Sequence, residues 1–241
     1  MFTNKLSRCA LALLTAIATI GMLASASPAS ASADKGIALT MKVTGDVQLK
    51  KAGTDRTLPL KFGTVLDDGD KIRTGDDGFA ILIFTDDKSQ LKLTAKTEVT
   101  IEGKRDANSN ITKRIAMEVG QVLAKVQQQK GSLQIATPTS VASVMGTEFW
   151  VIVFEDGTTQ VVTLEGLVQL LNTQSGRVVD VRPGQRGESH PNGDVGQGTP
   201  PRDQVPADPD SSFVPPHNIE IQVQDPDGRI RRVIIEYQET H

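Results

Sequence analysis

The sequence predicts an all-β fold: a rolled, solenoid-like or two-layer body of short strands. Two runs, Phe79–Phe84 and Phe149–Phe154, are apolar on both faces, which is typical of strands in a protein interior. Turn-forming segments rich in Gly and Asp recur at the spacing of all-β domains and leave little room for a helix. Successive short strands with buried inner faces would stack on one another to form the body.

The first 33 residues have the pattern of a secretory signal peptide. Lys5 and Arg8 supply positive charge, Ala10–Leu23 form a short apolar core, and Ala31–Ala33 is a small-residue cleavage site. An uncleaved anchor is the alternative, but the apolar run is short for a membrane span. We therefore expect cleavage after Ala33 and a periplasmic or secreted protein.

The composition of the mature chain excludes several kinds of functional site. Cys9 is the one cysteine, and it precedes the apolar core, so it is a poor candidate for lipidation. Its removal excludes disulfides, thiolate nucleophiles and zinc–cysteine sites. The formal charge is −3 (26 minus 29), and it becomes −5 (24 minus 29) once Lys5 and Arg8 are gone. A mildly acidic chain does not have the basic footprint of a nucleic-acid binder.

The first strands of the mature chain should lie between Ile37 and Leu60. Leu39, Met41 and Val43 alternate with polar residues, and a turn then leads into Val47–Lys50. Pro59 cannot donate a hydrogen bond to a neighbouring strand, so its strand should lie at a sheet edge.

The segment 66–78 is dense in Asp and Gly, and these residues tolerate the backbone conformations of tight turns. A calcium site is the alternative, because carboxylates cluster here. The spacing fits neither the EF-hand loop nor the glycine-rich nonapeptide repeat. Turn chemistry is the preferred interpretation.

Two further strands are expected at Leu91–Ala95 and Glu98–Glu102, followed by a polar loop at 103–110. The segment 115–129 is ambiguous, because its apolar residues fit both a helical face and strand alternation. Gly120 would weaken a helix by about 1 kcal/mol relative to alanine.

The stretch 137–170 organises the chain. The strand Phe149–Phe154 is followed by a tight turn at Glu155–Thr158 and a second strand at 160–164. A turn at Glu165-Gly166 starts another strand at 167–171, and a last strand is expected at 177–182. Trp150 lies among apolar neighbours, which favours a core position over a stacking platform for a sugar ring.

The sequence divides into a body, a linker and a terminal hairpin. We assign 34–187 to the all-β domain and 188–218 to a Pro/Gly-rich linker, which buries too little apolar surface to offset the entropy of ordering. At 219–241, alternating strands flank Asp225–Gly228, a strong turn, and predict a C-terminal β-hairpin. Two strands are marginal alone, so the hairpin should dock on the body or add to the sheet of a partner.

No constellation of catalytic residues stands out, so we expect neither an enzyme nor a cofactor or metal site. The histidines, His190, His217 and His241, all lie in or beyond the expected linker. There is no nucleophile elbow, phosphate-binding glycine loop or helical histidine pair. The glutamates Glu98, Glu102, Glu118, Glu148 and Glu165 are scattered, and nothing selects a glycosidase-like pair.

An ordered series of short motifs carries a family resemblance. Upstream are Gly69–Gly75 and Gly78–Leu82; downstream are Thr137-Pro138, Gly146–Phe149, Leu164–Gly166 and Pro183–Gln185. This series resembles the FecR domain over about residues 66–170. The signature residues, which we expect to be structural, are Gly69, Asp70, Thr74, Gly75, Gly78, Thr137, Pro138, Gly146, Thr147, Phe149, Glu165, Gly166 and Gly184.

The resemblance implies two strands, 114–119 and 121–127, in the ambiguous segment. Proteins best known for this domain are inner-membrane regulators, in which a periplasmic FecR domain senses a receptor and a cytoplasmic segment controls a sigma factor. This sequence departs from that plan, because we expect neither an internal transmembrane helix nor a cytoplasmic region. We predict a free-standing, exported protein-interaction or signalling-related module that acts on a protein partner of the cell envelope. Glycan or peptidoglycan binding is the alternative.

Overall fold

The computed structural model describes residues 36–108, 110–127, 132–201, 204–211, 218–224 and 230–236. The regular elements in these ranges are β-strands, β1 to β19, which confirms the predicted all-β fold. Among the described residues, no helix is long and apolar enough to cross a bilayer. The predicted signal peptide, 1–33, lies outside the described ranges.

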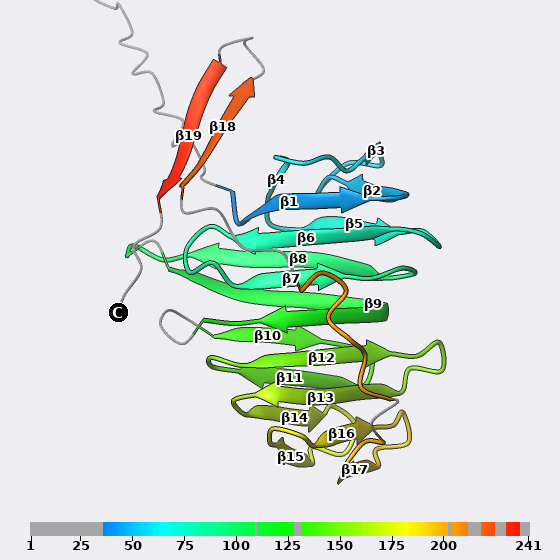
Figure 1. Ribbon diagram of the computed structural model, residues 1–241. Helices are drawn as coiled ribbons and strands as arrows, with labels where there is room; N and C mark the ends of the chain where they lie inside the picture. Colours follow the sequence, from blue (N-terminus) through cyan, green and yellow to red (C-terminus); the bar gives the residue numbers. More distant parts are fainter. Residues whose placement is uncertain are drawn as a thin grey trace, which may run out of the picture. The chain divides into compact units, whose positions relative to one another are not determined.

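The body consists of two sheets, A and B, that share one long strand, β9 (Ile111–Lys125). Sheet A is antiparallel throughout. In spatial order its strands are β4 (Val65–Leu66), β1 (Ala38–Thr44), β6 (Phe79–Phe84), β7 (Gln90–Leu93), the second half of β9, β12 (Glu148–Val153), β13 (Thr159–Glu165), β16 (Arg186–Ser189) and β17 (Val195–Gly198) (Figure 1).

Sheet B is antiparallel except where β9 and β10 run parallel. Its strands, in spatial order, are β3 (Thr57–Pro59), β2 (Val47–Lys50), β5 (Asp70–Thr74), β8 (Glu98–Arg105), the first half of β9, β10 (Leu133–Ala136), β11 (Ser140–Val144), β14 (Val168–Asn172) and β15 (Val178–Val181). Pro59 lies in β3, which ends this order, as predicted from its missing N–H donor.

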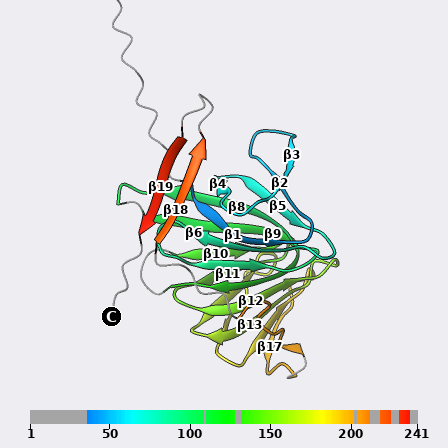
Figure 2. The ribbon, with the colours of Figure 1, turned by 45° about the horizontal axis from the view of Figure 1, so that its top comes forward.

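The hydrophobic core lies between the two sheets, so the body has two layers. Inward-facing residues of sheet A, such as Phe84, Phe149 and Val151, belong to the same buried cluster as Ile72 and Ile115 of sheet B. Each such side chain stabilises the fold by about 1.5–3 kcal/mol through burial. The strands of both layers can be followed in Figure 2, where the β1 end comes forward.

The predicted pair of strands at 114–119 and 121–127 is one continuous strand, β9. Its residues up to Val119 pair with β8 of sheet B, and those from Gly120 on pair with β12 of sheet A. Gly120 has a φ of +109°, a conformation that L side chains rarely adopt. Glycine therefore lets the strand pass from one sheet to the other without ending.

The sheets extend beyond the predicted linker boundary at 187. Residues 191–194 form a turn between β16 and β17, and β16 pairs with β13, so this part of the expected linker forms the last strands of sheet A. Backbone pairing stabilises a segment that has few apolar side chains. Residues 204–211 are also described, and they contact sheet A as set out below.

The predicted C-terminal hairpin is present as a separate two-stranded sheet. β18 (Asn218–Gln224) and β19 (Ile230–Glu236) are antiparallel, with Asn218 opposite Glu236. The turn predicted at 225–228 lies outside the described residues.

Candidate functional site

The scattered glutamates do not form a catalytic pair in the described part of the chain. Three of them contact basic residues of neighbouring strands: Glu98 contacts Lys71, Glu102 contacts Arg114 at 2.7 Å, and Glu148 contacts Lys125 at 3.2 Å. Glu118 and Glu165 are exposed. These contacts are those of charged strand residues on solvated faces.

The calcium site considered as an alternative at 66–78 finds no support. Among the described residues, no three His, Cys, Asp or Glu residues come close enough to hold an ion. His190 Nδ1 lies 3.4 Å from the Thr158 hydroxyl, and His190 Nε2 lies 3.6 Å from Glu188. His217 and His241 lie outside the described residues.

Asp70, a signature residue of the opening motif, holds a turn together. Its carboxylate is buried and accepts the backbone N–H groups of Ala52 at 3.0 Å and Asp67 at 2.9 Å. Lys51 Nζ lies 2.6 Å from it. Partial burial lowers the pKa of Lys51, but hydrogen bonds and charges from Asp67 and Asp70 outweigh this, so the pKa of Lys51 is raised. Gly69 precedes Asp70 with a positive φ of 83°.

Thr74, Gly75 and Gly78 lock the next turn. The Thr74 hydroxyl accepts the N–H of Thr97 at 2.8 Å and donates to the carbonyl of Thr94 at 2.6 Å. A side chain at Gly78 would place its Cβ 2.3 Å from the carbonyl oxygen of Asp46. Only glycine permits this approach of two backbones.

The closing motifs meet each other in space. Thr147 exchanges backbone hydrogen bonds with Val126, and its hydroxyl donates to the carbonyl of Leu167 at 3.2 Å. A Cβ at Gly166 would lie 2.5 Å from the carbonyl oxygen of Gly146. The turns before β12 and before β14 therefore pack backbone to backbone, which explains both signature glycines.

The remaining signature residues lie in several different parts of the fold. The Thr137 hydroxyl lies 2.8 Å from that of Thr159 and accepts the N–H of Ser140, while Phe149 is fully buried in the core. Pro138 and Glu165 are exposed, and Gly184 has a positive φ of 76° in a turn. Several signature residues thus hold turns, and these turns lie at separate places in the described fold.

A stronger candidate for function is the outer face of sheet A, where a segment of irregular backbone lies across the strands. We call residues 204–211 the strap (Figure 1, orange). Lys92 of β7 is only 6% exposed, and its Nζ contacts both carboxylate oxygens of Asp208 at 2.7 and 2.8 Å and the carbonyl of Asp210 at 2.7 Å. Lys42 of β1 contacts the Asp210 carboxylate at 2.5 Å. Two lysines of the sheet thus bind two aspartates of the strap.

The other end of the strap packs against apolar side chains. Val205 contacts a cluster on the outer face of sheet A formed by Leu123, Trp150 and Val162. The Trp150 side chain is 1% exposed, which confirms that it is buried. Its ring therefore offers no surface on which a sugar could stack.

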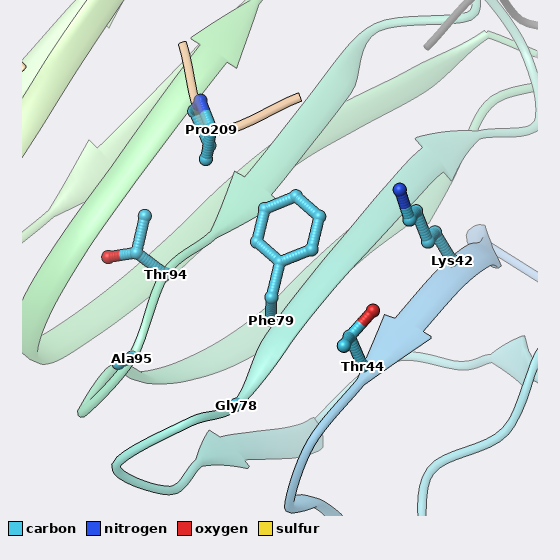
Figure 3. Close-up of a pocket in the computed structure, with 7 residues that line it drawn as sticks. All are labelled: Lys42, Thr44, Gly78, Phe79, Thr94, Ala95 and Pro209. Carbon is cyan, nitrogen blue, oxygen red and sulfur yellow. The ribbon is translucent and has the colours of Figure 1, made fainter. Parts of the chain in front are cut away.

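A pocket of about 410 Å³ opens where the strap meets β1, β6 and β7. Figure 3 shows the Phe79 ring in the middle of its lining, with Lys42 and Pro209 on different sides of it. Thr44 and Thr94 provide hydroxyl groups. The pocket thus combines an aromatic floor, one cation and hydrogen-bonding groups, which suits part of a peptide chain.

Comparison with known protein families finds a match for the middle of the chain. A family described as "FecR protein" matches residues 70–169. This segment is a FecR domain. It begins at β5 and ends within β14, so the FecR domain contributes central strands to both sheets, while β1–β4 and β15–β17 extend these sheets at either end.

Two solved structures are similar to this chain. Both are crystal structures of a "putative anti-sigma factor" from Parabacteroides distasonis ATCC 8503, with 17% and 18% sequence identity and TM-scores of 0.46 and 0.45. Each comparison covers 54% of this chain and 59% of the other. The chain thus spans less than two thirds of those proteins. No curated protein matches the sequence.

The strap joins the FecR domain to a part of the chain outside it. Lys92 and Trp150 belong to the FecR domain, whereas Val205, Asp208 and Asp210 follow it by more than thirty residues. Sequence reasoning missed this site, because ion pairs that join residues 116 and 168 positions apart leave no local pattern. The alternation of Asp and Pro within the expected linker was the available signal.

Proposed function

We propose that this chain is a non-enzymatic, exported FecR-domain protein that binds a protein partner in the bacterial cell envelope through the outer face of sheet A. The proposed role is related to signalling, as the FecR domain suggests. The observation that carries the proposal is the strap, because this face already binds an acidic segment through Lys42, Lys92 and an apolar cluster.

An acidic segment of a partner could contact the same groups. Lys92 is buried beneath the strap and makes three contacts to it, so a segment that covers Lys92 must replace its water with anionic or carbonyl groups. Charge-assisted hydrogen bonds of this kind are stronger than neutral ones and favour one register of binding. The strap therefore occupies this face in competition with the partner.

The large apolar side chains that are exposed elsewhere provide a weaker alternative surface. Met145 and Leu167 lie on the two turns that pack together before β12 and β14, whereas Phe62, Phe154 and Val178 belong to other elements. Single exposed apolar residues are common on protein surfaces. The strapped face combines burial, charge and a pocket, and for that reason we prefer it.

A site-specific photo-crosslinker tests the binding face. It replaces Thr44, an exposed residue of the pocket, in the protein as expressed in its own cell, and the control replaces Gln134, an exposed residue of β10 in sheet B. We expect a discrete protein adduct from position 44 and none from position 134. Equal labelling at the two positions, or an adduct at 134 alone, would reject this face.

The proposed envelope location is tested on the same material. N-terminal sequencing of the mature protein from the envelope fraction should begin at Asp34, because the small-residue cleavage site ends at Ala33. An intact N-terminus in the cytosolic fraction would contradict the proposed location.

A further inference from the structure

Lys113 occupies a position that alternation assigns to the core. It lies in β9 between Ile111 and Ile115, both buried in the cluster between the sheets, and its own side chain is 1% exposed. Lysine is almost never fully buried unless it is paired, because burial removes water from its charge. The position therefore calls for a specific chemical partner.

Two carboxyl groups and an aromatic ring surround the buried amine. Asp86 and Asp87, in the turn between β6 and β7, have side chains that are 2% and 4% exposed. Lys113 Nζ lies 2.5 Å from Asp87 Oδ2 and 2.9 Å from Asp86 Oδ2. The ring of Phe84 lies beneath it, with its centroid 5.3 Å from Nζ. Asp86 Oδ1 makes no hydrogen bond to any described residue.

We propose that Lys113 and Asp87 form an intramolecular isopeptide bond, joining Nζ to Cγ, and that Asp86 transfers the protons of the reaction. The bond would tie β9, where it belongs to sheet B, to the β6–β7 turn of sheet A.

The reaction balances without any other reagent. The Lys113 ammonium gives one proton to the Asp86 carboxylate, which passes it to Asp87, and the neutral amine then attacks Cγ of the neutral Asp87 carboxyl group. The new C–N bond forms as a C–O bond of Asp87 breaks, and the oxygen leaves as water with two protons that Asp86 relays from Nζ. An ammonium and a carboxylate thus become an amide and one water, and Asp86 returns to its initial state.

The geometry meets the requirements of each step. With a C–O bond of about 1.2 Å, Asp87 Cγ lies at most about 3.7 Å from Nζ, close to the ~3–3.5 Å of a near-attack arrangement. The backbone N–H of Ser89 donates to Asp87 Oδ1 at 2.9 Å, where negative charge develops during attack. Asp86 Oδ2 also accepts the N–H of Ile111 at 2.8 Å, which fixes its position beside the amine.

Burial favours the product. Three buried charged groups are costly, and condensation removes two of them from the site. Burial raises the pKa of Asp86, despite the opposing effect of Lys113, so this carboxyl is suited to hold a proton and pass it on. The product is a neutral amide beside the Asp86 carboxylate, so that one buried charge remains where there were three.

Peptide mapping of the purified full-length protein tests the bond. Trypsin cannot cleave after an acylated lysine, so the peptide 74–88 should be found joined to 106–114, lighter than their sum by one water, about 18 Da. Fragmentation should place the branch between Lys113 and Asp87. Recovery of most molecules as separate peptides cut after Lys113 would overturn the proposal, and a branch at Asp86 would overturn the assigned roles.

A second lysine–aspartate pair shows whether a short distance is enough for the bond to form or whether burial is also needed. Lys92 lies 2.7 Å from an oxygen of Asp208, but Asp208 is partly exposed, and the peptides that contain these two residues should remain separate in the same digest. Asp86→Asn should abolish the branched peptide, because the proton carrier is lost, and Lys113→Arg should abolish it as well. Undiminished branching in Asp86→Asn would reject the role of Asp86, and the wild-type map decides the bond even where a variant fails to fold.

Discussion

Substitution of Gly120 tests how one strand serves two sheets. Gly120 is the residue at which β9 leaves β8 and joins β12, and its φ is +109°. An added Cβ would lie 2.4 Å from Thr97 Oγ1 and 2.5 Å from Thr97 Cα. Gly120→Ala therefore combines backbone strain with a collision against a neighbouring strand connection.

The expected loss in the free energy of unfolding is the sum of the backbone strain and the collision. A left-handed backbone conformation costs an L residue about 1–2 kcal/mol. Crowding in a packed site adds about 1–3 kcal/mol, because Thr97 Cα is backbone and cannot rotate away. Gly176 provides a matched control, because its φ is +70° and nothing lies within 4 Å of its Cβ position. Gly176→Ala should therefore lose stability through backbone strain alone, without a collision.

Urea unfolding followed by circular dichroism gives both free energies of unfolding. We expect Gly120→Ala to lose about 2–5 kcal/mol and Gly176→Ala about 1–2 kcal/mol, and the entropic effect of the added methyl on the unfolded chain cancels between them. Equal losses in the two variants would refute the assignment of Gly120 as the crossing point of β9.

Three further predictions concern the ring, the hairpin and a turn. Trp150→Ala should lower the free energy of unfolding by about 3–5 kcal/mol in urea titrations, since the buried ring is structural; loss of polysaccharide retention without destabilisation would instead favour the glycan hypothesis. Ending the chain at residue 217 should leave crosslinking from position 44 unchanged, and loss of that adduct would show that the hairpin adds to a partner sheet. Hydrogen bonds from the N–H and hydroxyl of Thr158 hold the pKa of Asp156 below its ordinary value, so the turn loses stability as pH falls through that lowered pKa. Thr158→Ala should raise the pKa of Asp156 in a carbon-13 NMR titration; an unchanged value would contradict this cause.

Strands could be predicted from the sequence where the local pattern of apolar residues shows which side chains are buried. Phe79–Phe84 is apolar on both faces and forms β6 with those bounds, and Phe149–Phe154 corresponds to β12, which ends one residue earlier. Phe154 leaves the strand because its N–H bonds across the turn to the carbonyl of Thr158. The pairing partners of each strand do not follow from such local patterns.

The features that sequence reasoning missed depend on contacts between distant residues. β9 passes through Gly120 because two different sheets pair with its halves, whereas the local pattern was ambiguous between helix and strand and the resemblance implied two strands. The segment 188–198 has few apolar residues, yet its start pairs with β13 as the end of β16, and β17 then pairs with β16 and completes sheet A. Lys113 alternates with Ile111 and Ile115, a signal within the sequence that becomes meaningful only once the turn at Asp86-Asp87 lies beside it.

The strap gives the most direct test of the proposed binding face. Asp208→Asn with Asp210→Asn removes its ionic contacts to Lys92 and Lys42 but leaves both lysines in place. Loss of about 1–2 kcal/mol of strap binding should raise the share of uncovered faces, and with it the yield of the adduct from position 44, by about five- to thirtyfold. An unchanged or lower yield in this variant would contradict competition between the strap and a partner.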